Sequence, residues 1–144
     1  MICCKFAGFD YMKKERHYIS IVLFCMYILA VGIMCFIRPD EIPELGMNWM
    51  DVPVDKIVHF LMFIPFPSLA HSAMIPKEYG LVKQSLYIIA IAVLGTGTAY
   101  ATEQIQDALG YRTYELNDLI ADIAGIAAGS AVTLAHIALK TKKK

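Results

Sequence analysis

The chain has 144 residues, of which 58% are hydrophobic, and its 13 basic residues balance its 13 acidic residues. That length suffices for one domain and is too short for two ordinary ones. The mean hydropathy is +0.53, and the apolar residues form blocks of about 20, the length that crosses the hydrocarbon core of a bilayer. This pattern excludes an ordinary soluble domain and predicts an all-α integral membrane protein.

Four apolar blocks qualify as membrane spans, and they form a single domain that covers residues 18–139. The four blocks are 18–37, 57–75, 85–102 and 119–139. A basic leader (1–17) precedes this domain and a basic tail (140–144) follows it. The first block is longer than the apolar core of a signal peptide and no small-residue cleavage site follows it, so we expect it to stay as an anchor. Pro65 and Pro67 should bend or unwind the second helix.

The distribution of charge indicates how the spans are oriented. With the N-terminus in the cytoplasm, all of the 13 Lys and Arg residues except Arg38, Lys56 and Arg112 lie on the cytoplasmic side. Most acidic residues then lie on the outer side. Because Lys and Arg near span ends favour the cytoplasm, the sequence predicts a bundle of four transmembrane helices with both termini inside.

An acid, a base and a histidine stand where the second span begins, namely Asp55, Lys56 and His59. Asp55 is expected at or near the N-cap, where a carboxylate satisfies unpaired N–H groups and favours the positive end of the helix dipole. His59 follows at i+4 and therefore shares its face. Ionisable groups at membrane depth are costly to desolvate, so they need partners or a function.

A second polar cluster lies at the end of the third span. On a helix, Glu103, Gln106 and Asp107 share one face at i, i+3 and i+4. Gly110 is expected to end this helix at its C′ position.

A third cluster opens the fourth span. Asp118 and Asp122 lie on one stripe with Gly125 and Gly129, and small residues at such spacing let membrane helices approach closely. Asp122 is expected to face the inside of the bundle, because facing lipid would be costly.

All three clusters lie on the outer side in the predicted topology, so they can form one binding site. Its candidate residues are Asp55, Lys56, His59, Glu103, Gln106, Arg112, Asp118 and Asp122. Lys56 and Arg112 could hold phosphate or carboxylate, and His59 and Glu103 are candidates for acid–base catalysis. The carboxylates could also ligate a divalent ion, although the spacing assigns no metal ligand and no cofactor. The alternative is a structural network that cross-links the rim of the bundle.

Three motifs in order resemble the VanZ-like family. They are DKIVHF from Asp55, EQIQ from Glu103 with Arg112 close behind, and DLIADIAG from Asp118. The match covers about half of the chain, and Asp122 stands where the family pattern commonly has Asn. The resemblance implies a multi-pass protein of a bacterial cytoplasmic membrane with a role in low-level resistance to the glycopeptide teicoplanin, and it supplies no biochemical mechanism.

Two functions from different classes follow as expectations. The first is an envelope protein that binds a lipid or an anionic cell-wall headgroup at its outer face and contributes to glycopeptide resistance. The second is a membrane hydrolase or transferase that acts on a phosphorylated lipid. Transport is weaker, since four spans with no polar residues expected in the inner halves of the last three would leave no continuous path. The bilayer is the expected partner, and no nucleic acid is expected.

Overall fold

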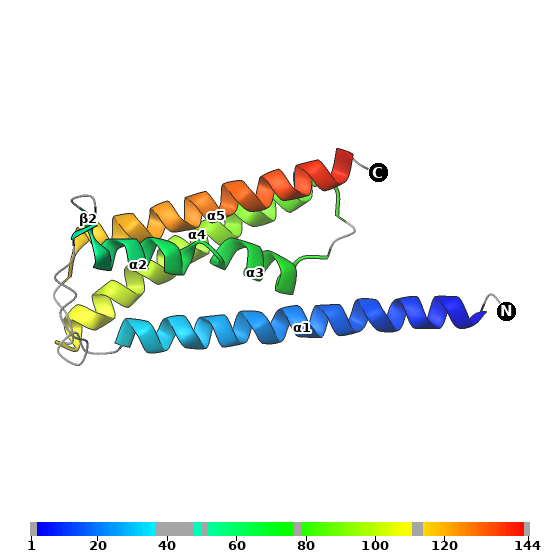
Figure 1. Cartoon of the computed structure of the whole chain (residues 1–144), viewed down its shortest axis with the longest axis horizontal. Helices are drawn as coiled ribbons and strands as arrows, with labels where there is room; N and C mark the ends of the chain where they lie inside the picture. Colours follow the sequence, from blue (N-terminus) through cyan, green and yellow to red (C-terminus); the bar gives the residue numbers. More distant parts are fainter. Residues whose placement is uncertain (1–2, 37–47, 50–51, 77–78, 111–113, 143–144) are drawn as a thin grey trace.

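The part of the chain that the structure describes is helical apart from one very short pair of strands (Figure 1). The computed structural model describes residues 3–36, 48–49, 52–76, 79–110 and 114–142, with the backbone alone at 3–13, 36, 48–49 and 52. The elements are α1 (Cys3–Phe36), β1 (Asn48–Trp49), β2 (Val52–Pro53), α2 (Val54–Phe63), α3 (Phe66–Met74), α4 (Leu81–Ala108) and α5 (Leu116–Lys142). β1 and β2 pair antiparallel.

Among the described residues, four helical segments are long and apolar enough to cross a membrane, in agreement with the predicted number of spans. They are Lys14–Cys35, Val54–Met74, Leu81–Ala108 and Leu116–Lys142. The helices extend beyond the predicted blocks: α1 begins inside the predicted leader, α4 continues six residues past 102, and α5 begins at Leu116. Hydropathy marks only the apolar length, whereas backbone hydrogen bonding continues into polar sequence.

Proline divides the second span into α2 and α3, as predicted. α2 ends at Phe63, and α3 begins at Phe66 with Pro67 in its first turn. A proline ring clashes with the preceding turn and offers no N–H, so an unbroken helix is disfavoured there, while a first-turn proline loses no hydrogen bond.

Glycines on α5 let this helix approach α2 and the break that follows it. A Cβ on Gly125 would collide with the carbonyl oxygen of Phe60, and one on Gly129 with that of Ile64. The predicted small-residue stripe is therefore the contact face of α5. Phe63, Ala99, Leu119 and Ile126 form the buried apolar core beside it.

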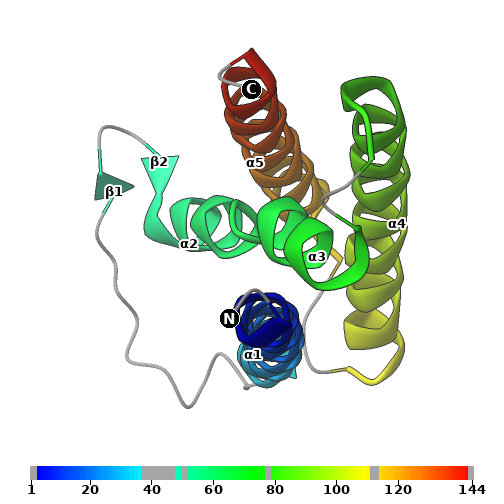
Figure 2. The same ribbon diagram turned by 90° about the vertical axis from the view of Figure 1, so that its right-hand side faces the viewer.

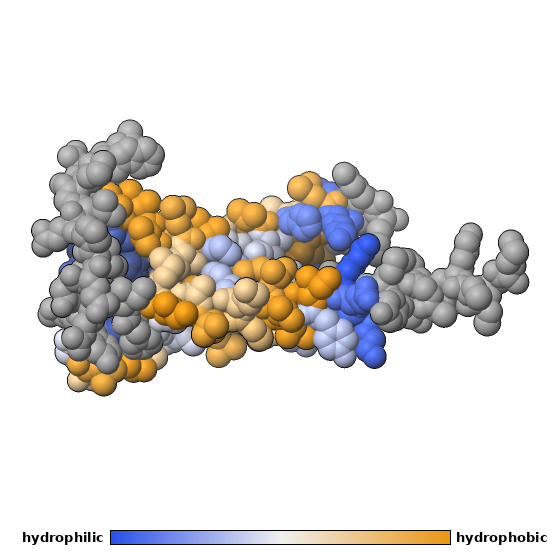
Figure 3. Space-filling view, turned by 60° about the horizontal axis from the view of Figure 1, so that its bottom comes forward, coloured by the Kyte–Doolittle hydropathy of each residue, from blue (hydrophilic) through white to orange (hydrophobic). Residues whose placement is uncertain are grey.

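Helix α1 lies at the edge of the bundle, mainly against α3 (Figure 2). None of its described side chains, at residues 14–35, is buried. Tyr27 donates a hydrogen bond of 2.7 Å to the carbonyl oxygen of Met62, and the Phe24 and Phe66 rings lie 6.1 Å apart. Hydrophobic side chains gather along the middle of the face seen in Figure 3, and hydrophilic ones gather at the end that carries both termini.

Candidate functional site

The start of α2, the end of α4 and the start of α5 meet at the end of the bundle opposite the termini (Figure 1). Gly110, with φ +67°, ends α4 here, and its N–H donates to the carbonyl of Asp107. This left-handed residue after the helix is the predicted C′ glycine. The turn brings α5 back beside α4, so that polar residues from three helices occupy one region.

Lys56 is the centre of an ion network. Its Nζ donates to Asp55 at 3.0 Å, to Glu115 at 2.5 Å, and to Asp118. Asp118 is fully buried, and a buried carboxylate requires a charged or hydrogen-bonding partner. Asp55 lies near the N-cap of α2, as expected, in the first turn at the positive end of the helix dipole. The expected capping hydrogen bond is not made, because Pro53 occupies the N-cap position and no side chain caps the helix. Asp55 pairs with Lys56 instead.

His59 lies between the two carboxylates of α5. Its Nδ1 is 2.9 Å from Oδ1 of Asp122, and its Nε2 is 3.9 Å from Oδ2 of Asp118. His59 is 8% exposed and Asp122 is 3% exposed. The i, i+4 spacing of the two aspartates places both on the face of α5 toward α2, so the predicted inward orientation of Asp122 is confirmed.

Helix α4 contributes Glu103, which is 4% exposed. Gln106 is also buried, but its Nε2 donates to the carbonyl oxygen of Cys35, so it joins α4 to the end of α1. Asp107 is exposed and accepts from the backbone of Tyr114 at 3.3 Å.

Two overlapping sets of side chains have the spacing of metal ligands, and both include His59. One ligand atom from each of His59, Glu103 and Asp122 lies within 4.8 Å of the other two, and all three residues are buried. The second set, with the same limit, is Asp55, His59 and Asp118. Spacing in the sequence alone could not identify either set, because each draws on more than one helix.

The structure thus unites most of the predicted site. It brings together Asp55, Lys56, His59, Glu103, Asp118 and Asp122, and directs the side-chain amide of Gln106 to α1; Arg112 lies outside the described residues. Glu115 was missed, although its position three residues before Asp118 in an acidic segment was a usable signal.

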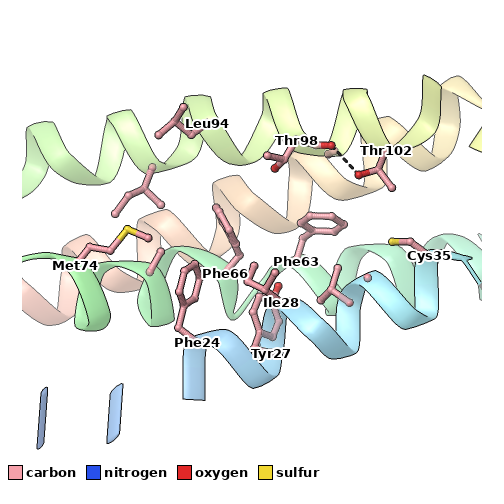
Figure 4. A pocket seen from close by; sticks show the side chains of 15 residues that line it. Phe24, Tyr27, Ile28, Cys35, Phe63, Phe66, Met74, Leu94, Thr98 and Thr102 are labelled. Atoms are coloured by element: carbon pink, nitrogen blue, oxygen red, sulfur yellow. Dashed lines mark hydrogen bonds between the residues drawn. The ribbon is translucent and has the colours of Figure 1, made fainter. Parts of the chain in front are cut away.

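An apolar cavity of about 420 Å³ lies between α1, α3 and α4, with Phe63 of α2 also in its wall (Figure 4). Its walls run from Phe24 and Met74 to Cys35 and Thr102. The hydroxyl of Thr102 donates to the carbonyl of Thr98 at 2.8 Å, so this threonine presents little polarity. We call this cavity the groove. Sequence patterns could not reveal it, because it depends on how far α1 stands from α4.

Polar residues are also buried in the other half of the bundle, which corrects one expectation. His71 on α3, Gln84 on α4 and Thr133 on α5 are each less than 10% exposed. The amide of Gln84 donates to the carbonyl of Tyr79, and the Thr133 hydroxyl donates to that of Gly129 at 2.7 Å. This half of the bundle, which is the inner half in the predicted topology, therefore does contain polar groups.

Comparison of the chain with models of known families, with curated proteins and with solved structures found no match. Evidence for function therefore comes from the geometry of the site and from the motifs themselves.

Proposed function

We propose that this protein binds a membrane lipid, with the headgroup at the polar cluster and an acyl chain in the groove. The carrying observation is that two residues in the wall of the groove are close neighbours, along α4 and α2, of two residues of the polar cluster. Thr102, in the wall of the groove, directly precedes Glu103, and Phe63, also in the wall, lies one turn after His59. An amphipathic ligand needs such a polar end joined to an apolar channel, and in a bilayer the channel is surrounded by acyl chains.

The orientation proposed here is four spans with both termini in the cytoplasm of a bacterial cell. Its support is the concentration of Lys and Arg in the two tails, together with Lys77 just before α4 and Lys83 in its first turn. Both termini lie at one end of the bundle (Figure 1). The polar cluster would then face the outer side, where envelope lipids and glycopeptide antibiotics are found.

The biological role that we propose is a VanZ-like one, namely reduced susceptibility to teicoplanin-type glycopeptides. The support is the ordered set of motifs, whose acidic and histidine members converge in space. Lys56 is shared by three carboxylates, so an anionic headgroup would have to compete for it. Because carboxylates are in excess at the cluster, a lipid headgroup that binds together with a cation suits the site better than an anionic headgroup alone.

Lipid binding can be tested by filling the groove. Gly32 lines it and Gly97 does not, and a Cβ on either would meet nothing within 4 Å. Gly32→Phe should abolish retention of phosphatidylglycerol from mixed vesicles, measured by native mass spectrometry of the full-length protein, while Gly97→Phe should retain it. Equal retention by the two variants would exclude the groove as the acyl-chain site.

The resistance role has a separate test. Expression in a susceptible host should raise the inhibitory concentration of teicoplanin, and Lys56→Ala or Arg112→Ala should remove that increase. Lys140→Ala, exposed at the far end of α5, is the matched control. Unchanged susceptibility when the wild-type protein is expressed would refute the resistance role and leave lipid binding intact.

A second candidate is a hydrolase or transferase that acts on a phosphorylated lipid. The observation that favours it is the buried contact of 2.9 Å between His59 and Asp122, beside Glu103. A carboxylate can orient an imidazole for proton transfer. Phosphate release from a lipid phosphate by the wild type, lost in His59→Gln and Glu103→Gln, would support this function. Absence of turnover with and without divalent ions would rule it out.

A further inference from the structure

The polar cluster contains two places suited to a cation. In the first, the ammonium of Lys56 contacts both Asp55 and Asp118, which are members of one of the two ligand sets. The protein's own cation therefore occupies that place. The second place lies among His59, Glu103 and Asp122. The three ion pairs of Lys56 are all with other residues. A lysine ammonium at the first place is direct evidence that this environment accepts a positive charge.

The charge of the cluster supports the same conclusion. Its carboxylates are Asp55, Glu103, Glu115, Asp118 and Asp122, and its described cationic group is Lys56. Even if Arg112 is counted as a second base, the carboxylates of the cluster outnumber the bases. Several of these carboxylates are almost fully buried, and an excess of buried negative charge in a low-dielectric bundle is strongly unfavourable. A divalent ion would offset it.

The geometry of the second place fits one ion. Ligand atoms that share a metal at about 2.1 Å lie roughly 3 to 4 Å apart, and those of His59, Glu103 and Asp122 are all within 4.8 Å of one another. The three come from α2, α4 and α5, so the ion would also join these helices.

We propose that His59, Glu103 and Asp122 bind one divalent transition-metal ion such as Zn²⁺ or Mn²⁺. One imidazole and two carboxylates suit these ions better than Mg²⁺ or Ca²⁺, which prefer oxygen ligands alone. Three protein ligands leave coordination positions open. If the proposed lipid also binds, its headgroup phosphate could take one of these positions; metal binding itself does not depend on the lipid.

The decisive experiment measures metal binding without lipid. Full-length protein in dodecyl maltoside, stripped by chelator, is titrated with Zn²⁺ and then with Mn²⁺ by calorimetry, and bound metal is counted after desalting. We expect about one Zn²⁺ per chain and a higher melting temperature with the ion. His59→Gln, Glu103→Gln and Asp122→Asn each remove a direct ligand and should weaken metal binding by at least about tenfold. Changes in residues that only support the ligands already weaken binding by about that factor.

Matched controls distinguish metal binding at the proposed site from non-specific binding by acidic side chains elsewhere in the protein. Asp107 lies one turn from Glu103 on α4 and is exposed, and Glu15 is an exposed acid on α1; neither belongs to the two ligand sets or to the ion network of Lys56, so Asp107→Asn and Glu15→Gln are the controls. Both should bind as the wild type does. A Co²⁺ titration of the wild type, which should give a visible spectrum of an imidazole-bound ion, provides a measurement that does not depend on the folding of any variant. Less than stoichiometric binding by the wild type, or equal weakening by the controls, would overturn the proposal.

Discussion

Helix α1 and the polar end of the bundle both reverse the pattern of burial found in a soluble protein. α1 contains the most apolar of the four spans, yet none of that span is buried. The polar end contains His59, Glu103, Asp118 and Asp122, and all four are less than 10% exposed. The apolar helix is outside and the charged groups are inside.

The difference follows from the solvent. Lipid tails are as apolar as leucine, so an apolar side chain gains little when it leaves lipid for a helix interface. A carboxylate gains much by leaving lipid for a polar interior. Hydropathy therefore locates the spans of this chain, whereas small and polar residues locate the faces that pack. The comparison can be tested by changing residues on each side of it.

The largest effect is expected where α5 approaches α2. Gly125→Ala and Gly129→Ala each force a methyl group against a backbone carbonyl that belongs to another segment. Overpacking against backbone should cost about 2 kcal/mol at each position, so the double variant should lose about 4 kcal/mol of unfolding free energy in mixed-micelle denaturation. Gly97→Ala, where a Cβ meets nothing, should be neutral or slightly stabilising. Equal effects at all three positions would show that the helices do not pack through this stripe.

The next effect concerns the buried charge at Asp118. Asp118→Asn keeps the shape of the side chain and removes the only buried carboxylate among the described partners of Lys56. Breaking such a pair typically costs about 3 kcal/mol, here reduced because two other carboxylates remain. Glu115→Gln removes a partner that is 49% exposed, and exposed pairs contribute at most about 1 kcal/mol. The same denaturation measurement distinguishes the two, and a larger loss in Glu115→Gln would contradict the assigned pairing.

The features that the sequence predicted depend on local rules. Four spans follow from apolar length, the break between α2 and α3 from the missing N–H of proline, and the close face of α5 from its glycine spacing. Convergence of most of the site residues at one end of the bundle was also expected, because the predicted topology put the three polar segments on the same side.

The features that the sequence could not predict depend on how each helix is rotated about its axis and how far the helices lie from one another. The orientation of Gln106 toward Cys35 rather than toward the site is set by the rotation of α4 about its axis. The sharing of Lys56 by three carboxylates and the groove both require the relative positions of separate helices. No spacing within a single helix carries that information.

Apolar truncations should show the contrast between the two regions directly. Ile126 on α5 is 1% exposed, and Leu29 on α1 is 65% exposed. Ile126→Ala should lose about 2 kcal/mol, because the cavity left in a packed interior is not refilled. Leu29→Ala should change stability by less than about 0.5 kcal/mol, as surface substitutions usually do, provided that the protein stays in micelles or bilayers. A comparable loss at Leu29 would mean that a partner covers α1.

The smallest effect should come from the polar contact that attaches α1. Tyr27→Phe removes the hydrogen bond of 2.7 Å to the carbonyl oxygen of Met62 and keeps the ring. Hydrogen bonds between membrane helices contribute about 0.6 kcal/mol on average, so global unfolding should barely change. Protease access to α1 should nevertheless rise, because this helix has no buried side chain among those described to hold it. Tyr18→Phe, at a tyrosine that is 57% exposed, is the matched control. Protection of α1 that is identical in both variants would show that aromatic and apolar contacts with α3, rather than this hydrogen bond, keep α1 in the bundle.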